Sequence, residues 1–383
     1  MFTADDIKYI GVQEKITDLF ESQYPLPDGV TYNSYVILDQ KVAVLDTVDA
    51  RFCDEWLQLL QSSLGQRQPD YLIIHHMEPD HSAGIKAFAD KYPQAKIAAS
   101  AKAFAIMKGF FGTDFADRQL KLSEGDVLGL GRHSLRFIAA PMVHWPEVMM
   151  SYDEQTGTLF SADAFGRFGV PTANCSPIDE ARRYYIGIVG KYGAQVQAVL
   201  KKASALQLTG ICPLHGPMLA GESMRKMLGL YDTWSSYRPE QQGVTVAYAS
   251  IYGHTGAAAE KLAEMLAAHE VQTQTFDLAR CDMYQAVASA FRFDKLVLAA
   301  STYNGDVMPA MRAYIQALTD RGFRDRTAAF IENGCWAPTA ARVMRQMLQD
   351  CKDIRFAEPA VKLMSDLDDG SAEQLRQLAE QLK

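Results

Sequence analysis

Residues 73–85 read IIHHMEPDHSAGI, and this stretch decides how the first half of the 383-residue chain is interpreted. A short apolar run leads directly into four side chains that commonly bind metals, namely His76, Glu78, Asp80 and His81. Every second side chain of an extended segment points the same way, so alternating ligands after a strand converge on one place. By this spacing His76 and Glu78 fit one metal ion, and Asp80 and His81 fit a neighbouring one.

Three further candidates follow later apolar segments that are predicted to be strands. His144 comes after LRFIAAPMV, Asp163 after TLFSA and His215 after GICPL. With these residues the set contains four histidines and three carboxylates. That set is too large for one tetrahedral zinc ion and suits two metal ions that share a carboxylate. We expect Asp163 to be the shared ligand, because the other residues are already assigned to one metal or the other.

Other histidines are given structural roles. His75 alternates to the opposite face from His76 and is expected to pack in the core. His133 and His269 are expected on the solvated surface. A lone His144 or His215 would also be more typical of a core histidine, so the metal hypothesis depends on the complete set.

A different pattern follows the polar segment SYRPEQQGV, residues 235–243, which is expected to be a linker. Predicted strands and helices alternate from there to the end of the chain, and this alternation is typical of one doubly wound parallel sheet. The predicted strands are 244–249, 271–276, 295–300, 327–331 and 360–364, and the predicted helices are 256–268, 309–318, 338–348 and a terminal helix. The first part has many short predicted strands, with its clearest helices at 52–64 and 180–206. We therefore predict two domains, residues 1–240 and 243–383.

Three loops at the carboxyl ends of these parallel strands have the composition of a cofactor site. The first joins a strand to a helix, and its small hydroxyl residues and glycine let backbone N–H groups and the helix N-terminus bind an anion. No Gly-x-Gly-x-x-Gly or Gly-Lys-Ser/Thr is present, which argues against a dinucleotide and a nucleoside triphosphate. Tyr303 and Trp336 offer flat surfaces for an isoalloxazine ring. The candidate residues are Ser250, Ile251, Tyr252, Gly253, His254, Thr255, Ser301, Thr302, Tyr303, Asn304, Gly305, Asp306, Asn333, Gly334, Cys335 and Trp336.

Both halves resemble the flavodiiron proteins, specifically the short class called A-type flavoproteins. The motif H-x-E-x-D-H at residues 76–81, with the later His, Asp and His, is similar to their metallo-β-lactamase-type domain, and the three loops are similar to the FMN site of flavodoxin. The resemblance implies an α/β protein with an N-terminal metallo-β-lactamase-like αββα sandwich followed by a flavodoxin-like doubly wound parallel sheet. Hydrolases of the first fold carry H-x-H-x-D-H and bind zinc. Glu78 replaces their second histidine, and this additional carboxylate favours iron or manganese over zinc.

The resemblance implies an oxidoreductase that passes electrons from FMN to a non-haem diiron centre and reduces O2 to water, NO to N2O, or both. His76, Glu78 and His144 would hold one iron, Asp80, His81 and His215 the other, with Asp163 between them. Whether His76 or His81 is a direct ligand stays open. Alternatives are a dizinc metallo-β-lactamase-type hydrolase fused to a flavodoxin-like module, and an electron carrier with structural metals. His254 departs from the Ser or Asn expected in the phosphate loop.

Composition and charge exclude several other classes. A net charge of −8 without a long Lys/Arg run argues against nucleic-acid binding, and no run of 18 apolar residues predicts a membrane span. The first residues do not resemble a signal peptide, and the six scattered cysteines indicate a reducing, cytoplasmic location.

The resemblance also implies partners. It implies a head-to-tail homodimer or tetramer. Because no rubredoxin module is evident, it further implies a separate electron donor such as rubredoxin or a reduced deazaflavin. The sequence leaves open the preference for O2 or NO, the donor, and the choice between dimer and tetramer.

Overall fold

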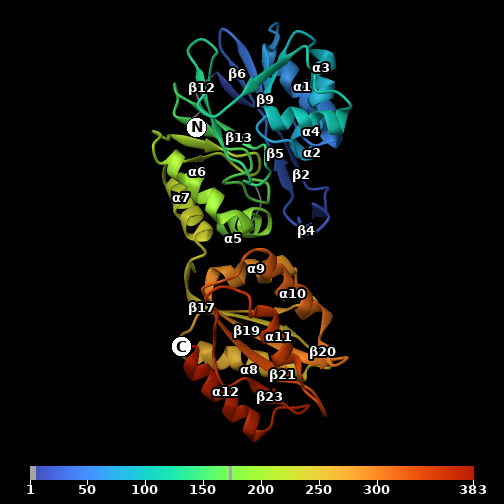
Figure 1. The fold of residues 1–383 in the computed structure, drawn as a ribbon, viewed down its shortest axis with the longest axis vertical. Helices are drawn as coiled ribbons and strands as arrows, with labels where there is room; N and C mark the ends of the chain where they lie inside the picture. Colours follow the sequence, from blue (N-terminus) through green and yellow to red (C-terminus); the bar gives the residue numbers. More distant parts are fainter. Residues whose placement is uncertain (1–5, 172–174) are drawn as a thin grey trace. The chain divides into compact units, whose positions relative to one another are not determined.

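The computed structural model describes residues 6–171 and 175–383, which form two compact units (Figure 1). The division falls between Asp232 and Thr233. Among the described residues, no helix has both the length and the apolar character that a membrane crossing requires.

Two six-stranded sheets make up the centre of the first unit. The first sheet has the order β1 (Ile7–Tyr9), β6 (Tyr35–Leu38), β7 (Val42–Leu45), β8 (Tyr71–Ile73), β9 (Lys96–Ser100) and β10 (Gln119–Leu122). The second has the order β11 (Val127–Gly129), β12 (Ser134–Ala139), β13 (Met149–Asp153), β14 (Thr158–Phe160), β15 (Gly210–Cys212) and β16 (Leu219–Ala220). Two small ribbons pair β2 (Val12–Glu14) with β5 (Val30–Tyr32), and β3 (Leu19–Phe20) with β4 (Tyr24–Pro25).

The two sheets share one apolar core. Ile37, Leu45 and Ile73 from the first sheet belong to the same buried cluster as Phe137 and Phe160 from the second. Burial of this much apolar surface between two sheets is the main driving force for the sandwich.

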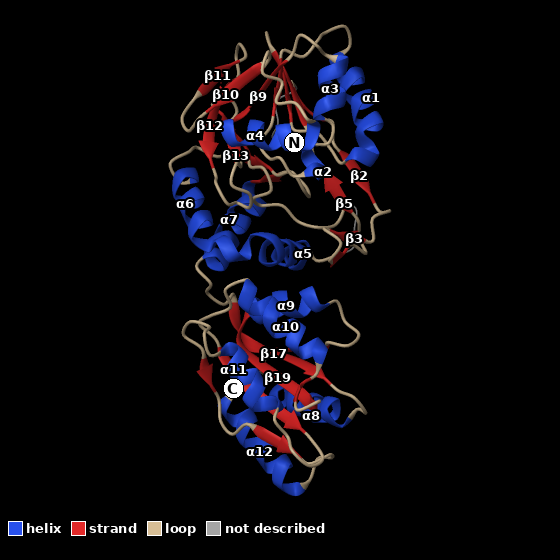
Figure 2. Cartoon of the chain, turned by 45° about the vertical axis from the view of Figure 1, so that its right-hand side comes forward, coloured by secondary structure: helices blue, strands red, loops and turns tan. Residues whose placement is uncertain are grey.

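Helices cover the sandwich on its outer sides. They are a 3-10 turn Ala50–Phe52, α1 (Cys53–Leu64), α2 (Pro79–Ser82), α3 (Ile85–Lys91), α4 (Ala101–Phe111), α5 (Pro177–Tyr184), α6 (Gly193–Ala203) and α7 (Gly221–Ser235). In Figure 2, α1 and α3 lie on the opposite flank of the unit from α6 and α7. This arrangement confirms the predicted αββα sandwich.

The predicted helix 180–206 is wrong as one element. After α5, the chain forms a π-helical turn Tyr185–Val189 and a 3-10 turn Gly190–Tyr192 before α6 begins. A side chain at Gly187 would collide with Tyr24, since its Cβ would lie 2.7 Å from Tyr24 Cε1. Gly187 thus allows close packing against Tyr24, and the glycines at 187, 190 and 193 lower the helical propensity of this segment.

The second unit is one parallel sheet with helices on its faces. The main order is β18 (Thr273–Asp277), β17 (Gln241–Ala249), β19 (Phe293–Tyr303), β21 (Thr327–Asn333) and β22 (Arg355–Phe356), with β23 (Val361–Leu363) also on β21 and β20 (Asp306–Val307) on β19. The helices are α8 (His254–Ala268), α9 (Met283–Arg292), α10 (Pro309–Asp320), α11 (Ala340–Leu348) and α12 (Asp369–Gln381). The predicted doubly wound sheet is confirmed, although β17 begins at Gln241, inside the segment expected to be a linker.

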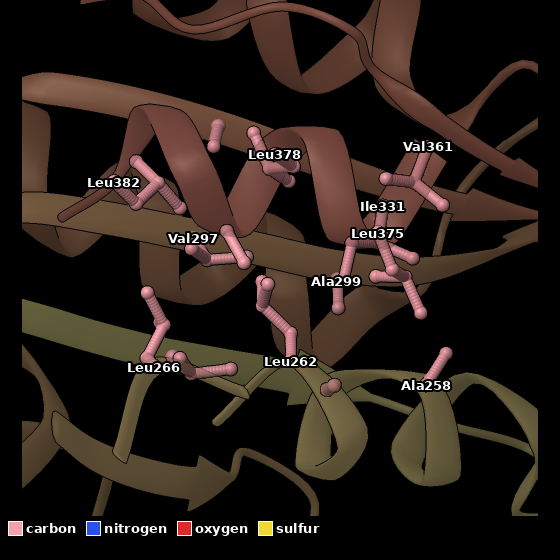
Figure 3. Close-up of a cluster of buried hydrophobic side chains, with 14 of the residues drawn as sticks. Ala258, Leu262, Leu266, Val297, Ala299, Ile331, Val361, Leu375, Leu378 and Leu382 are labelled. Atoms are coloured by element: carbon pink, nitrogen blue, oxygen red, sulfur yellow. The ribbon is translucent and has the colours of Figure 1, made fainter. Parts of the chain in front are cut away.

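One face of this sheet is covered by α8 and α12. Figure 3 shows Leu262 and Leu266 from α8 and Leu375 and Leu378 from α12 meeting over the central strands. Val297 of β19 is completely buried beneath them. This packing holds the strands in place, and the loops at their carboxyl ends therefore start from well-packed backbone.

The expectation that His133 lies on the surface is wrong, since only 1% of its surface is exposed. Its Nδ1 lies 2.9 Å from Asp153 Oδ2, its Nε2 lies 2.9 Å from Asp6 Oδ2, and its backbone N–H donates to Asp39. The hydrogen bond with Asp153 outweighs the effect of burial, and with the help of Asp6 it raises the pKa of His133 to about 9. His133 therefore joins the end of β13 to the residue before β1 and to the β6–β7 turn.

We expect His133→Gln to lower the free energy of unfolding by about 2 kcal/mol near pH 6. The folded-state pKa lies above the ordinary value of about 6.5, so this stabilisation is complete below about pH 6.5 and is lost as the pH rises through about 9. Urea denaturation at pH 6 and pH 10 measures the difference. His269→Gln, at an exposed histidine, serves as the control. A cost of His133→Gln that does not decrease at pH 10 would contradict the charged contact.

Candidate functional site

The structure brings the seven predicted metal ligands together in two groups. His76 and Glu78 follow β8, and Asp80 and His81 lie in α2. His144, Asp163 and His215 follow β12, β14 and β15. The first group is His76, Glu78, His144 and Asp163, and the second is Asp80, His81 and His215; in each, the potential ligand atoms lie within 4.8 Å of one another.

Asp163 lies between the two groups. Its Oδ2 is 3.1 Å from His144 Nε2 and 3.6 Å from His76 Nε2. Its Oδ1 is 3.4 Å from His81 Nε2 and 3.9 Å from His215 Nε2. Each carboxylate oxygen thus faces one group, which is the arrangement required of a carboxylate that bridges two metal ions.

The site contains buried carboxylate oxygens that make no hydrogen bond to any described residue. Within the described residues, both carboxylate oxygens of Asp80 and Oδ1 of Asp163 are buried without a hydrogen-bond partner. His81 Nε2 and His215 Nε2 face each other at 3.0 Å. Buried charges and facing imidazole nitrogens are typical of residues that bind a cation. The donor set of imidazole and carboxylate therefore fits two metal ions, and its carboxylate content suits iron.

Electrostatics at the site favour positive charge. Burial opposes protonation of His76, but the charge of Asp163 and hydrogen bonds with Glu147 and Glu78 raise the pKa of His76 well above its usual range. The same balance, with Asp163 and Glu78 as partners, raises the pKa of His144 to about 9. Burial opposes ionisation of Asp163, but the charge of His76, the hydrogen bond with His144 and the nearby imidazole of His81 keep the pKa of Asp163 well below its usual range.

Two of the histidines are oriented by groups behind them. His76 Nδ1 lies 3.0 Å from Glu147 Oε1, which also accepts from Met77 N–H at 2.9 Å. His215 Nδ1 donates to the carbonyl oxygen of Thr31 at 2.7 Å. These bonds turn both Nε2 atoms toward the groups defined above, as is usual for metal-binding histidines. The sequence analysis did not identify Glu147 or Thr31 as supporting residues. Glu147 lies only three residues after His144, but it is in a loop, where no helical or strand periodicity indicates which way a side chain points.

His75 is buried as expected, but its contacts are polar. Its Nδ1 lies 2.5 Å from Asp46 Oδ2, its Nε2 lies 2.8 Å from Ser151 Oγ, and its N–H donates to Asp46 Oδ1. Ser151 is on β13 of the second sheet and Asp46 follows β7 of the first. This chain of hydrogen bonds holds the backbone immediately before His76.

The three predicted loops of the second unit surround a pocket of about 640 Å³, a volume in the range of cofactor sites. Most of the predicted residues line it, namely Ser250, Ile251, Tyr252, His254, Thr255, Ser301, Thr302, Tyr303, Asn304, Gly305, Asn333, Gly334, Cys335 and Trp336. Ala337, Thr339 and Ser365 also line the pocket and were missed by the sequence. Gly253 and Asp306 are not among the lining residues. Gly253 has a φ of 97°, which suits glycine at this turn, and Asp306 pairs with Arg312 at 2.5 Å.

The pocket is lined by both polar groups and aromatic rings. At the first loop, Thr255 Oγ1 lies 2.8 Å from Ser301 Oγ, and the helix α8 begins at His254. The N-terminus of this helix favours an anion such as a phosphate. Trp336 is 87% exposed and Tyr303 47% exposed, so flat surfaces are available for a ring system. These features fit FMN.

The chain matches family models in both units. Residues 30–216 match the ODP family beta lactamase, and residues 245–357 match a flavodoxin domain. The chain belongs to the flavodiiron proteins. This flavodiiron protein is 27% identical over 361 residues to the anaerobic nitric oxide reductase flavorubredoxin of Vibrio vulnificus, covering 90% of this chain and 72% of that relative.

Solved structures show the same fold over nearly the whole chain. The rubredoxin oxygen:oxidoreductase of Desulfovibrio gigas aligns with a TM-score of 0.91 at 22% identity, covering 99% of this chain and 96% of that one. The flavodiiron protein of Giardia intestinalis aligns with a TM-score of 0.88 at 23% identity, covering 99% and 94%. At these identities the likeness establishes the fold alone.

We expect Glu147→Gln to weaken iron binding about tenfold, because the neutral amide no longer raises the basicity of His76. Competition with a chromophoric chelator measures the affinity. Glu154→Gln, at an exposed glutamate paired with Arg136 in the same unit, is the matched control. Equal iron affinities in the two variants would show that Glu147 does not support this ligand.

Proposed function

We propose that this flavodiiron protein uses FMN and a non-haem diiron centre to reduce O2 to water, NO to N2O, or both. The observation that carries the proposal is the position of Asp163, with one carboxylate oxygen facing each group of ligands. A pocket that fits FMN in the same chain supplies the second requirement. The printed names of the Desulfovibrio and Vibrio relatives refer to oxygen and to nitric oxide, respectively, and support this substrate class.

Seven side chains of this chain would hold the metals. We assign His76, Glu78 and His144 to one iron, Asp80, His81 and His215 to the other, and Asp163 to both. His76 and His81 are proposed as direct ligands, since the Nε2 atom of each approaches Asp163. When bound, the irons would supply reducing electrons and Lewis acidity to the diatomic substrate, and FMN would relay the electrons from a donor.

The polypeptide contributes position and charge. Glu147 and Thr31 hold the rings of His76 and His215, and the carboxylates balance the positive charge of the metals. Reduction of O2 to two waters needs four electrons and four protons, and conversion of two NO to N2O and one water needs two of each. We further propose a separate donor, such as rubredoxin or a reduced deazaflavin, and a head-to-tail homodimer or a tetramer that brings the FMN of one chain near the diiron site of another.

The first test is the metal and flavin content of the purified protein, expressed per chain, followed by consumption of O2 and NO by the reduced enzyme. Two irons and one FMN with turnover are expected. Two zinc ions from iron-replete cells would instead favour a hydrolase of the metallo-β-lactamase type. FMN with structural metals and no turnover would favour an electron carrier.

Asp163→Ala is expected to lose at least one of the two irons and to abolish turnover while FMN is retained, because neither group keeps its shared carboxylate. Elemental analysis and the flavin absorption spectrum measure both contents. Asp90→Ala, at an exposed aspartate of the same unit, is the control. Retention of both irons and of full turnover in Asp163→Ala would contradict the bridging role.

Trp336→Ala is expected to weaken FMN binding about fivefold to tenfold, since loss of a stacking ring costs about 1 kcal/mol. Quenching of flavin fluorescence during titration of the flavin-free protein gives the dissociation constant. Trp336→Tyr, which keeps a flat ring, should restore most of the affinity. Equal affinities of Trp336→Ala and wild type would place the flavin ring away from Trp336.

A further inference from the structure

Tyr184 carries a buried hydroxyl for which the described residues provide no hydrogen-bond partner. The residue is 0% exposed and is the last residue of α5, directly before the π-helical turn. A buried hydroxyl without a partner costs about 1–3 kcal/mol, so native proteins nearly always satisfy it with protein, water or a ligand. The partner of Tyr184 is therefore expected to be a molecule other than the polypeptide.

The ring of Tyr184 lies against the second group of ligands. Its centroid is 5.4 Å from the centroid of the His215 ring and 5.1 Å from that of the Phe168 ring. The turn that carries Asp163 is equally close, since a Cβ on Gly166 would lie 3.3 Å from Tyr184 Cε1. These contacts fix the ring beside His215 and beside the turn that follows Asp163.

The charges around Tyr184 agree with this position. After burial, the charge of Asp163 is the largest influence that raises the pKa of Tyr184 well above its usual range, and Asp80 and Glu78 act in the same direction. The hydroxyl thus lies in the field of carboxylates from both groups. A phenol hydroxyl can donate one hydrogen bond.

The neighbouring Tyr231 is a buried tyrosine whose hydroxyl does have a hydrogen-bond partner. Tyr231 is also completely buried, but its hydroxyl accepts from Phe165 N–H at 2.5 Å and so holds the turn after Asp163. Tyr231 therefore has a structural role. The hydroxyl of Tyr184 has no comparable bond, although both rings lie near the same turn.

We propose that the Tyr184 hydroxyl donates a hydrogen bond to the small molecule that binds between the two metal-binding groups. In the proposed reaction this molecule is O2 or NO, so the inference rests on the function proposed above. Tyr184 would then orient the bound diatomic and stabilise negative charge that develops on it. This role is distinct from those of the seven ligands, because a phenol hydroxyl at this position acts on the substrate rather than on the iron.

Azide is a suitable probe, since it is a small anion whose terminal nitrogens accept hydrogen bonds. The test compares wild type, Tyr184→Phe and the matched variant Tyr185→Phe, whose ring packs against Tyr231 at 4.8 Å. Each purified protein is first analysed for iron and FMN. Azide is then titrated into the oxidised holoenzyme, and its antisymmetric stretching frequency is recorded by infrared spectroscopy in H2O and in D2O.

Tyr184→Phe is expected to keep iron and FMN, to bind azide about threefold to tenfold more weakly, and to shift the azide stretching frequency. Tyr185→Phe should match wild type in all three. In wild type the frequency should change in D2O, and this change should be absent in Tyr184→Phe.

Unchanged affinity and frequency in an iron-loaded Tyr184→Phe would overturn the proposal and indicate that the hydroxyl binds only a structural water. If Tyr184→Phe does not fold, a wild-type azide frequency that is the same in H2O and D2O overturns the proposal by itself. If the purified wild-type protein contains no iron, the proposed function is contradicted, and this inference is contradicted with it. That result is known from the metal analysis, before azide is added.

Discussion

A single buried carboxylate organises the first unit. Asp163 presents one oxygen to His144 and His76 and the other to His81 and His215. Burying that charge costs free energy unless positive charge compensates it on both sides. In the proposed site, the four strand ends would place one cation at each oxygen of this side chain.

The supports form a second layer around the ligands. Glu147 and Thr31 orient two imidazoles from behind, and the hydrogen-bonded chain from Asp46 through His75 to Ser151 fixes the backbone before His76. Such outer contacts restrict ring rotation, so that the ligand atoms are positioned before any metal binds. The precision of the site therefore depends on residues that would not be recognised as ligands.

Candidate site residues could be predicted from the sequence where they lie close together in one short segment. The motif at residues 76–81 and the loops after β17, β19 and β21 could be predicted, because strand ends place adjacent residues at one edge of a sheet. Ser365 could not be predicted to line the flavin pocket, since it is brought there by the distant segment after β23. His133 could not be distinguished from a surface histidine, because its partners Asp6 and Asp153 are remote in sequence. The prediction of one helix over residues 180–206 was wrong, because the spacing of apolar residues does not reveal that closely spaced glycines weaken a helix.

The origin of the ligands has a consequence for how the chain folds. His76 and Glu78 follow a strand of the first sheet, whereas His144, Asp163 and His215 follow strands of the second. Metal ions held by both sets would act as cross-links between the two layers of the sandwich. Their binding free energy then becomes part of the folding free energy of the first unit, while the flavin-binding sheet, built entirely after Thr233, receives none of it directly. Iron supply in the cell would thus set the lifetime of one half of the molecule more strongly than that of the other.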